Sequence, residues 1–286
     1  MRLAIVGDVH ELWDAEDAPL LDAEGYDAVL FVGDLAGYTV RGGLATARRI
    51  AALRTPAYCL PGNHDAVHAL QLGAEIFPRW APLRRVLGRR MPGRVEALRE
   101  ALGPVRLTGY ALHDLGAFTL LAARPHSCGG PRLAYARYLR RAFGVEDMAG
   151  SAAKLRALVD RAPAERPLVV LAHDGPTGLG AERDAPCGRD FHPDGGDWGD
   201  PDLRAALDHA AATGKRVAAV CFGHMHHGLR GQGGDRRWQA REGPTLFVNA
   251  ARVPRHGRRG RHHVALELEG GAARVEPRWL GPPVAR

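Results

Sequence analysis

The chain has 286 residues, of which 45% are hydrophobic and 25% are charged. This ordinary globular composition excludes collagen-like, coiled-coil and largely disordered proteins. No apolar run approaches the roughly 20 residues of a membrane helix, so we predict no membrane partner. The N-terminal residues do not form the apolar stretch of a signal peptide, and the four cysteines are widely spaced. We therefore expect a cytoplasmic location.

The chain is basic, because 39 Lys and Arg residues against 32 Asp and Glu residues give a net charge of +7. Nearly all of the basic residues are arginine, which makes good bidentate contacts to phosphate. A nucleic-acid partner is compatible with this charge. It is not favoured, because an arginine-rich codon bias explains the same composition more simply.

Three short apolar runs near the N-terminus predict buried strands at 2–6, 28–32 and 57–60. Helix-like stretches at 14–24 and 43–54 lie between them. This alternation indicates parallel strands joined by right-handed crossovers. A polar cluster follows each run, and ligands of parallel sheets bind beyond the carboxyl ends of the strands.

The segment 66–165 differs in character, because residues 79–106 hold eight arginines against two glutamates. We interpret 66–165 as an insertion or cap within one domain that spans 1–286. Within it, the patterns predict strands and helices at 105–112, 116–122, 131–142 and 151–160.

The pattern of the N-terminal part then returns. Strands are predicted at 168–172 and 217–222, and Asp200-Pro201 has the composition of a helix start. The runs at 245–249, 262–267 and 272–276 predict antiparallel strands joined by polar turns.

Residues whose side chains can bind metal ions follow five of these predicted strands. They are Asp8 and His10, Asp34, Asn63, His173, and His224 and His226. Carboxylates and imidazoles suit divalent Mn, Fe, Zn or Co better than Ca. Seven ligands are too many for one ion with open positions. They predict two divalent ions bridged by a carboxylate, which is a common arrangement for phosphate-ester hydrolysis.

The ordered blocks GDVH (7–10), GD (33–34), GNHD (62–65), His173 and GHMH (223–226) resemble the calcineurin-like metallophosphoesterases. The stretches HDGPTGLG (173–180) and GDWGDPDL (196–203) resemble, more specifically, an uncharacterised branch of cyanobacteria and plants. The resemblance implies an α/β fold with a four-layer α/β/β/α core, in which a two-sheet β-sandwich is flanked by helices.

The resemblance also implies residue roles. Asp8, His10 and His226 hold one ion, while Asn63, His173 and His224 hold the other. Asp34 bridges the two ions, and His64 protonates the leaving oxygen.

One position departs from the better-known phosphoprotein phosphatases. Gly37 stands where they carry a carboxylate that orients the catalytic histidine. The partner of His64 therefore stays open between Asp65, Asp174 and a loop.

The predicted activity is metal-dependent hydrolysis of a phosphomonoester or phosphodiester of a small molecule or nucleotide. The first alternative is a metal-dependent nuclease that acts on DNA or RNA. The second is a non-catalytic scaffold that retains the fold. Four basic residues in loops are predicted to bind substrate: Arg124, His126, Arg252 and Arg255.

Overall fold

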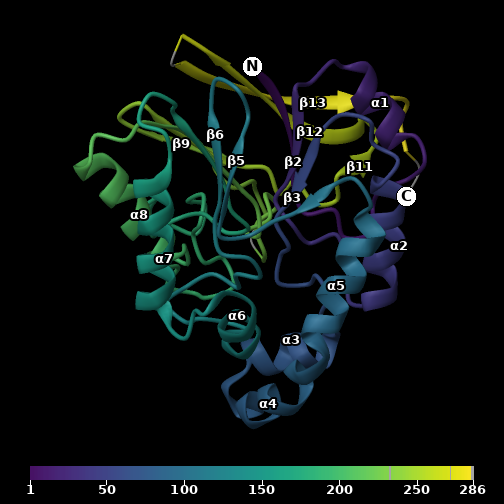
Figure 1. Cartoon of the computed structure of the whole chain (residues 1–286). Helices are drawn as coiled ribbons and strands as arrows, with labels where there is room; N and C mark the ends of the chain where they lie inside the picture. The colour runs from purple at the N-terminus through teal and green to yellow at the C-terminus, as the bar shows by residue number, and fades with distance from the viewer. Residues whose placement is uncertain (232, 271, 285–286) are drawn as a thin grey trace.

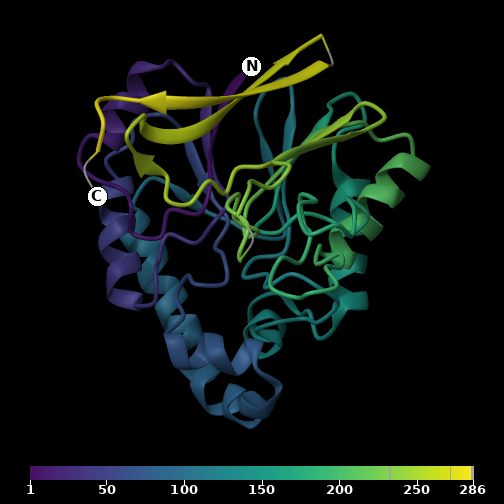
Figure 2. The ribbon, with the colours of Figure 1, turned by 180° about the vertical axis from the view of Figure 1, so that it is seen from behind.

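Two β-sheets pack face to face and carry helices on their outer faces, as Figures 1 and 2 show from opposite sides. The computed structural model describes residues 1–231, 233–270 and 272–284. The first sheet has the order β11-β12-β1-β2-β3-β4, with β13 paired to β12. Its strands are β1 (Arg2–Val6), β2 (Ala28–Phe31), β3 (Ala57–Cys59), β4 (Arg106–Leu107), β11 (His256–Gly257), β12 (Gly260–Glu269) and β13 (Ala272–Leu280).

The second sheet has the order β5-β6-β7-β8-β10-β9. Its strands are β5 (Ala111–Asp114), β6 (Thr119–Ala122), β7 (Leu168–Leu171), β8 (Val217–Phe222), β9 (Gln239–Glu242) and β10 (Thr245–Asn249). Within this sheet, β6, β7, β8 and β10 run parallel to one another.

The apolar strands are buried on both faces, which explains their unbroken hydrophobic runs. In β1, Leu3 and Ile5 belong to the core between the two sheets, whereas Ala4 belongs to the core beneath the outer helices. In β7, Val169 and Leu171 face the other sheet in the same way. The period of two therefore produces the predicted four layers.

The outer layers are formed by helices that lie on opposite sides of the sandwich in Figure 1. The first sheet is covered by α1 (Asp17–Ala23), α2 (Val40–Ile50) and α5 (Met91–Leu102), and the second by α7 (Met148–Arg161) and α8 (Pro201–Ala212). Helix α8 begins at the predicted residue pair. The side chain of Asp200 does not cap it, because that carboxylate accepts hydrogen bonds from Arg124 and Ser127 instead.

A helical projection extends beyond the sandwich at the lower end of Figure 1. It holds α3 (Ala69–Ile76), η1 (Pro78–Leu83), α4 (Arg84–Leu87) and η2 (Gly88–Arg90), and α6 (Ala136–Phe143) lies beside it. The predicted insertion 66–165 is broader than this projection. Strands β4, β5 and β6 belong to the two sheets, and Leu98 and Leu102 of α5 lie in the core of the first outer layer. We therefore propose 66–90 as the bounds of the cap.

One predicted strand runs in the opposite sense from the expectation. The strands near 262–267 and 272–276 are antiparallel partners, as expected. However, β10 pairs parallel with β8 and is antiparallel only to β9. In a sequence, two parallel neighbouring strands are usually recognised by the helix that connects them. No helix is described between Gly223 and Trp238, so the sequence lacked that signal.

Within the described ranges, no helix has both the length and the apolar character that crossing a bilayer requires.

Candidate metal centre

The seven predicted ligands lie together where β1, β2, β3, β7 and β8 end. Strands β1, β2 and β3 are mutually parallel, and so are β7 and β8. The carboxyl ends of parallel strands share an edge, so the loops after them meet. The structure thereby brings side chains from positions 8 to 226 into one cluster.

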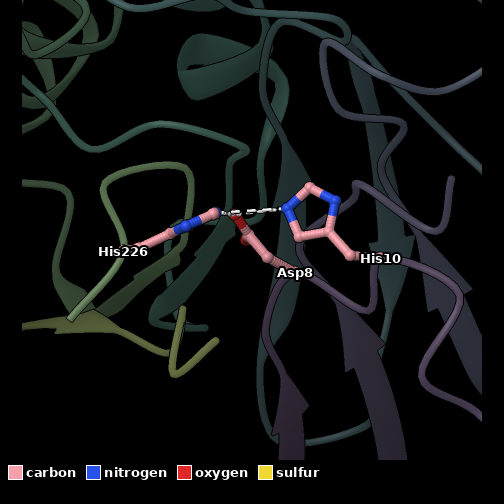
Figure 3. A group of neighbouring side chains, drawn as sticks. All are labelled: Asp8, His10 and His226. Carbon is pink, nitrogen blue, oxygen red and sulfur yellow. Dashed lines mark hydrogen bonds and ion pairs between the residues drawn. The ribbon is translucent and has the colours of Figure 1, made fainter. Parts of the chain in front are cut away.

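Asp8, His10 and His226 form the first group, and their side chains point toward one another in Figure 3. His226 Nε2 lies 3.2 Å from Asp8 Oδ2 and 3.1 Å from His10 Nε2. The side chain of Asp8 is fully buried, whereas that of His226 is 37% exposed. This group therefore opens toward solvent on the His226 side.

Asn63, His173 and His224 form the second group, which is more deeply buried. Asn63 Oδ1 lies 2.8 Å from His173 Nε2 and 3.0 Å from His224 Nδ1. Asp34 lies between the groups. Its Oδ2 is 3.8 Å from His10 Nε2, and its Oδ1 is 3.6 Å from His173 Nε2. The two oxygens of one carboxylate thus face the two groups.

Main-chain hydrogen bonds orient two of the imidazoles. His10 Nδ1 donates to the Ala36 carbonyl at 3.0 Å, and His173 Nδ1 donates to the Val32 carbonyl at 2.8 Å. In the neutral rings, each Nε2 is then an unprotonated lone pair aimed into the cluster. Lone pairs that face other acceptors at about 3 Å repel unless a proton or cation lies between them. The donor set therefore fits divalent metal ions.

Three of these residues have left-handed backbones, with φ of 44° at His10, 52° at Asp34 and 65° at His224. This region is uncommon for residues other than glycine and is typical of strained functional sites. Close packing adds a further constraint. A Cβ at Gly62 would collide with Asp34 and His173, and one at Gly223 would collide with Asp8.

The charges within the cluster shift its pKa values. Burial raises the pKa of Asp8 and of Asp34, but neighbouring histidines, chiefly His226 for Asp8 and His173 for Asp34, lower both below their usual range. Burial and, to a lesser extent, the neighbouring His173 together lower the pKa of His224 to about 3. The carboxylates are therefore ionised and His224 is neutral at neutral pH, as metal ligation requires.

His64 stands beside the first group, with its ring 5.1 Å from that of His10. Its Nδ1 donates to the main-chain carbonyl of Gly37. Gly37 has no carboxylate to offer, but its backbone supplies the hydrogen-bond partner of His64. Asp65 is committed elsewhere, because its carboxylate accepts from the N–H groups of Gly62 and Ala36. Of the alternatives left open for His64, the structure places a loop carbonyl in contact with it.

Two residues that the sequence did not single out support the ligand loops. Tyr135 donates its hydroxyl to the Asn63 carbonyl at 2.7 Å. Asn249 donates its side-chain amide to the Met225 carbonyl at 2.7 Å, inside the GHMH block. Asn249 is the last residue of β10, which is parallel to β8. A prediction of β10 as a parallel strand would have placed Asn249 at the edge of the sheet where the ligands lie.

The four predicted substrate-binding residues do not come together. Arg124, 2% exposed, pairs with Asp200 and Asp202, and Arg255, 2% exposed, pairs with Asp17. His126 is fully buried and donates to the Gly62 carbonyl at 3.0 Å. These three side chains are buried and bind other groups of the protein, so they are not accessible to a substrate. Arg252, with a side chain 41% exposed, remains accessible.

Asp14, Asp17 and His256 form a separate cluster whose atoms also have metal-ligand spacing. Arginines already occupy its carboxylates. Arg255 Nη1 lies 2.5 Å from Asp17, and Arg261 Nη2 lies 2.6 Å from Asp14. This cluster is an ion-pair network.

Comparisons with known proteins bear on the fold and the family of the chain. No curated protein sequence matches the chain. Among solved structures, a dimetal phosphatase from Danio rerio superposes with a TM-score of 0.52 at 11% identity, covering 98% of this chain and 96% of that one. Another solved chain superposes with a TM-score of 0.56 at 12% identity, covering 98% and 99%. At such identities the likeness concerns the fold.

The family model described as calcineurin-like phosphoesterase matches residues 1–228, which include all of the predicted ligands. The chain belongs to the calcineurin-like phosphoesterase family.

Proposed function

We propose that this protein is a dinuclear-metal-dependent phosphoesterase that hydrolyses a phosphomonoester or phosphodiester of a small molecule or nucleotide. The observation that carries the proposal is the convergence of two ligand groups on the two oxygens of Asp34. Family membership supports the same reaction class.

In this proposal Asp8, His10 and His226 would hold one divalent ion, and Asn63, His173 and His224 would hold the second. Asp34, whose two oxygens face the two groups, would serve both sites. Mn, Fe, Zn and Co suit this set of carboxylate, amide and imidazole ligands. When bound, such ions supply Lewis-acid stabilisation of phosphoryl oxygens and lower the pKa of an attacking water.

His64 is the proposed general acid. Its Nδ1–H is held by the Gly37 carbonyl, so Nε2 is the atom that carries and releases the transferred proton.

The exposed side of the first group indicates where substrate enters. His226 is the most accessible of its three members, and the ring of His64 lies 5.1 Å from that of His10. A phosphoryl group placed there contacts the cluster and keeps its leaving oxygen within reach of His64.

The first experiment measures metal content and the hydrolysis of 4-nitrophenyl phosphate and bis(4-nitrophenyl) phosphate with added Mn²⁺. We expect about two metal ions per chain and turnover of at least one ester. The ratio of the two rates ranks monoester against diester. A purified chain that retains no metal and hydrolyses neither ester contradicts the proposal and favours the scaffold interpretation.

A further inference from the structure

A cavity of about 760 Å³ lies beside the candidate metal centre, and the mechanism proposed above does not use it. Its wall includes His227, which directly follows the predicted ligand His226 and donates its main-chain N–H to the Ala251 carbonyl at 3.0 Å. The remaining wall comes from residues 252–254 and 256–259, Trp279 and Val284, with Gly228 and Asp235. A volume of this size accommodates a small organic ligand.

The cavity is strongly basic. Arg252, Arg258 and Arg259 line it, and Asp235 is the carboxylate among its described lining residues. Asp235 lies at the limit of ion-pair distance from Arg252, at 3.9 Å. Among the ion pairs of the described ranges, none involves Arg258 or Arg259. Among the described lining residues, three guanidiniums thus face one carboxylate.

Trp279 contacts two of these cations. The guanidinium carbon of Arg259 lies 5.2 Å from the Trp279 ring centre, and that of Arg252 lies 5.4 Å from it. Cation–π attraction stabilises each guanidinium at the ring. His262 packs edge-on against the same ring at 4.8 Å, which restricts its movement. One packed aromatic side chain thus positions both guanidiniums in the cavity wall.

Two guanidiniums on one aromatic ring, with Asp235 as the carboxylate among the described lining residues, offer several N–H donors suited to phosphate oxygens. We propose that this cavity, centred on Arg252, Arg259 and Trp279, binds a phosphate group that is separate from the one at the metal centre. Two sources share this chemistry: a second phosphate of the substrate, and free phosphate. The assignment of this phosphate to the substrate rests on the proposed function, whereas the binding of phosphate in the cavity does not.

The test is calorimetric titration of the full-length protein with inorganic phosphate. We expect the Arg252→Gln/Arg259→Gln variant to lose at least tenfold in affinity for phosphate at the cavity. Arg48→Gln is the matched control, because Arg48 is an exposed arginine of α2 that does not line the cavity. Trp279→Leu keeps every charge but removes the ring, and it should weaken binding as well.

The same titration is repeated in the Asp34→Asn background, in which the proposed metal centre is impaired. Binding that persists there, and is lost with the arginine pair, supports the cavity even if no hydrolysis is ever found. Equal phosphate affinity in the wild type and the arginine pair variant, or an equal loss in Arg48→Gln, overturns the proposal.

The two sources are separated by kinetics. If the substrate supplies the second phosphate, the arginine pair variant raises the KM for a nucleoside 3′,5′-bisphosphate at least tenfold more than the KM for a nucleoside 3′-monophosphate. If free phosphate is the ligand, the two KM values shift equally, and the inhibition constant of inorganic phosphate rises instead.

Discussion

Two clusters of histidine and aspartate in this chain have nearly the same composition but different surroundings. The strand-end cluster around Asp34 and the cluster of Asp14, Asp17 and His256 both place ligand atoms within 4.8 Å of one another. In the second cluster, Arg255 and Arg261 neutralise the carboxylates. No arginine forms an ion pair with Asp8 or Asp34 among the described residues, and their neighbours are imidazoles.

The difference teaches that residue types and spacing do not by themselves define a metal site. The charge of the neighbours decides whether a cluster of carboxylates still needs a cation. Substitutions in the first cluster should therefore affect metal and activity, whereas those in the second should affect stability.

The largest effect is expected for Asp34→Asn. Removing the charge that faces both ligand groups should lower kcat/KM by at least about 10³-fold and reduce bound metal. Asp17→Asn is the matched change in the other cluster and should keep its metal. Metal analysis and ester hydrolysis of both variants check this contrast. Equal metal loss in the two variants would remove the distinction between the clusters.

His64→Ala should act on the reaction and spare the metal. We expect a loss of roughly 10²–10⁴-fold on an alkyl phosphate ester, whose leaving oxygen needs a proton. The loss on a 4-nitrophenyl ester should be much smaller, because that leaving group is stable as an anion. His192→Ala, at an exposed loop histidine, is the control. Equal losses on both esters would argue against a general-acid role.

Asp17→Ala should destabilise the fold by about 3–5 kcal/mol, because it leaves Arg255 buried without its partner. Urea denaturation at pH 7 measures the change in the free energy of unfolding. Asp208→Ala, at an exposed carboxylate 3.9 Å from Arg204, should cost less than about 1 kcal/mol. A mild effect at Asp17 would mean that Arg255 finds water or another acceptor.

The smallest expected effect is the loss of stability of the fold at acidic pH. Burial and, to a lesser extent, the neighbouring His227 and His263 together lower the pKa of His262 to about 2. The unfolded chain takes up a proton near pH 6.5 that the folded chain refuses, so stability falls as pH falls from 6.5. From pH 7 to pH 5 the wild type should lose about 2 kcal/mol more than His262→Phe. Denaturation curves at both pH values measure this, and parallel losses would contradict it.

The clustering of the candidate ligands could be predicted from the sequence because each lies in the loop that follows its strand. A short apolar run identifies the strand, and strand polarity places the next residues at one edge. Asp8, His173 and His224 all follow this local rule.

Other features depend on contacts between distant segments, and no local pattern encodes those. Tyr135 reaches Asn63 across 72 positions of the sequence, and the partner of His64 is a backbone carbonyl with no side-chain signature. Arginines in a basic chain suggest a solvent-exposed role. The burial of Arg124 and Arg255 becomes evident only when the fold brings Asp202 and Asp17 to them.

Backbone carbonyls hold three imidazoles of this centre: those of Ala36 for His10, Val32 for His173 and Gly37 for His64. A point mutation at any of these three supporting positions changes the side chain but leaves the carbonyl in place. The orientation of the ring is therefore inherited with the path of the main chain. Sequence drift at positions 32, 36 and 37 can thus proceed without loss of the histidine geometry, provided that the loop keeps its course.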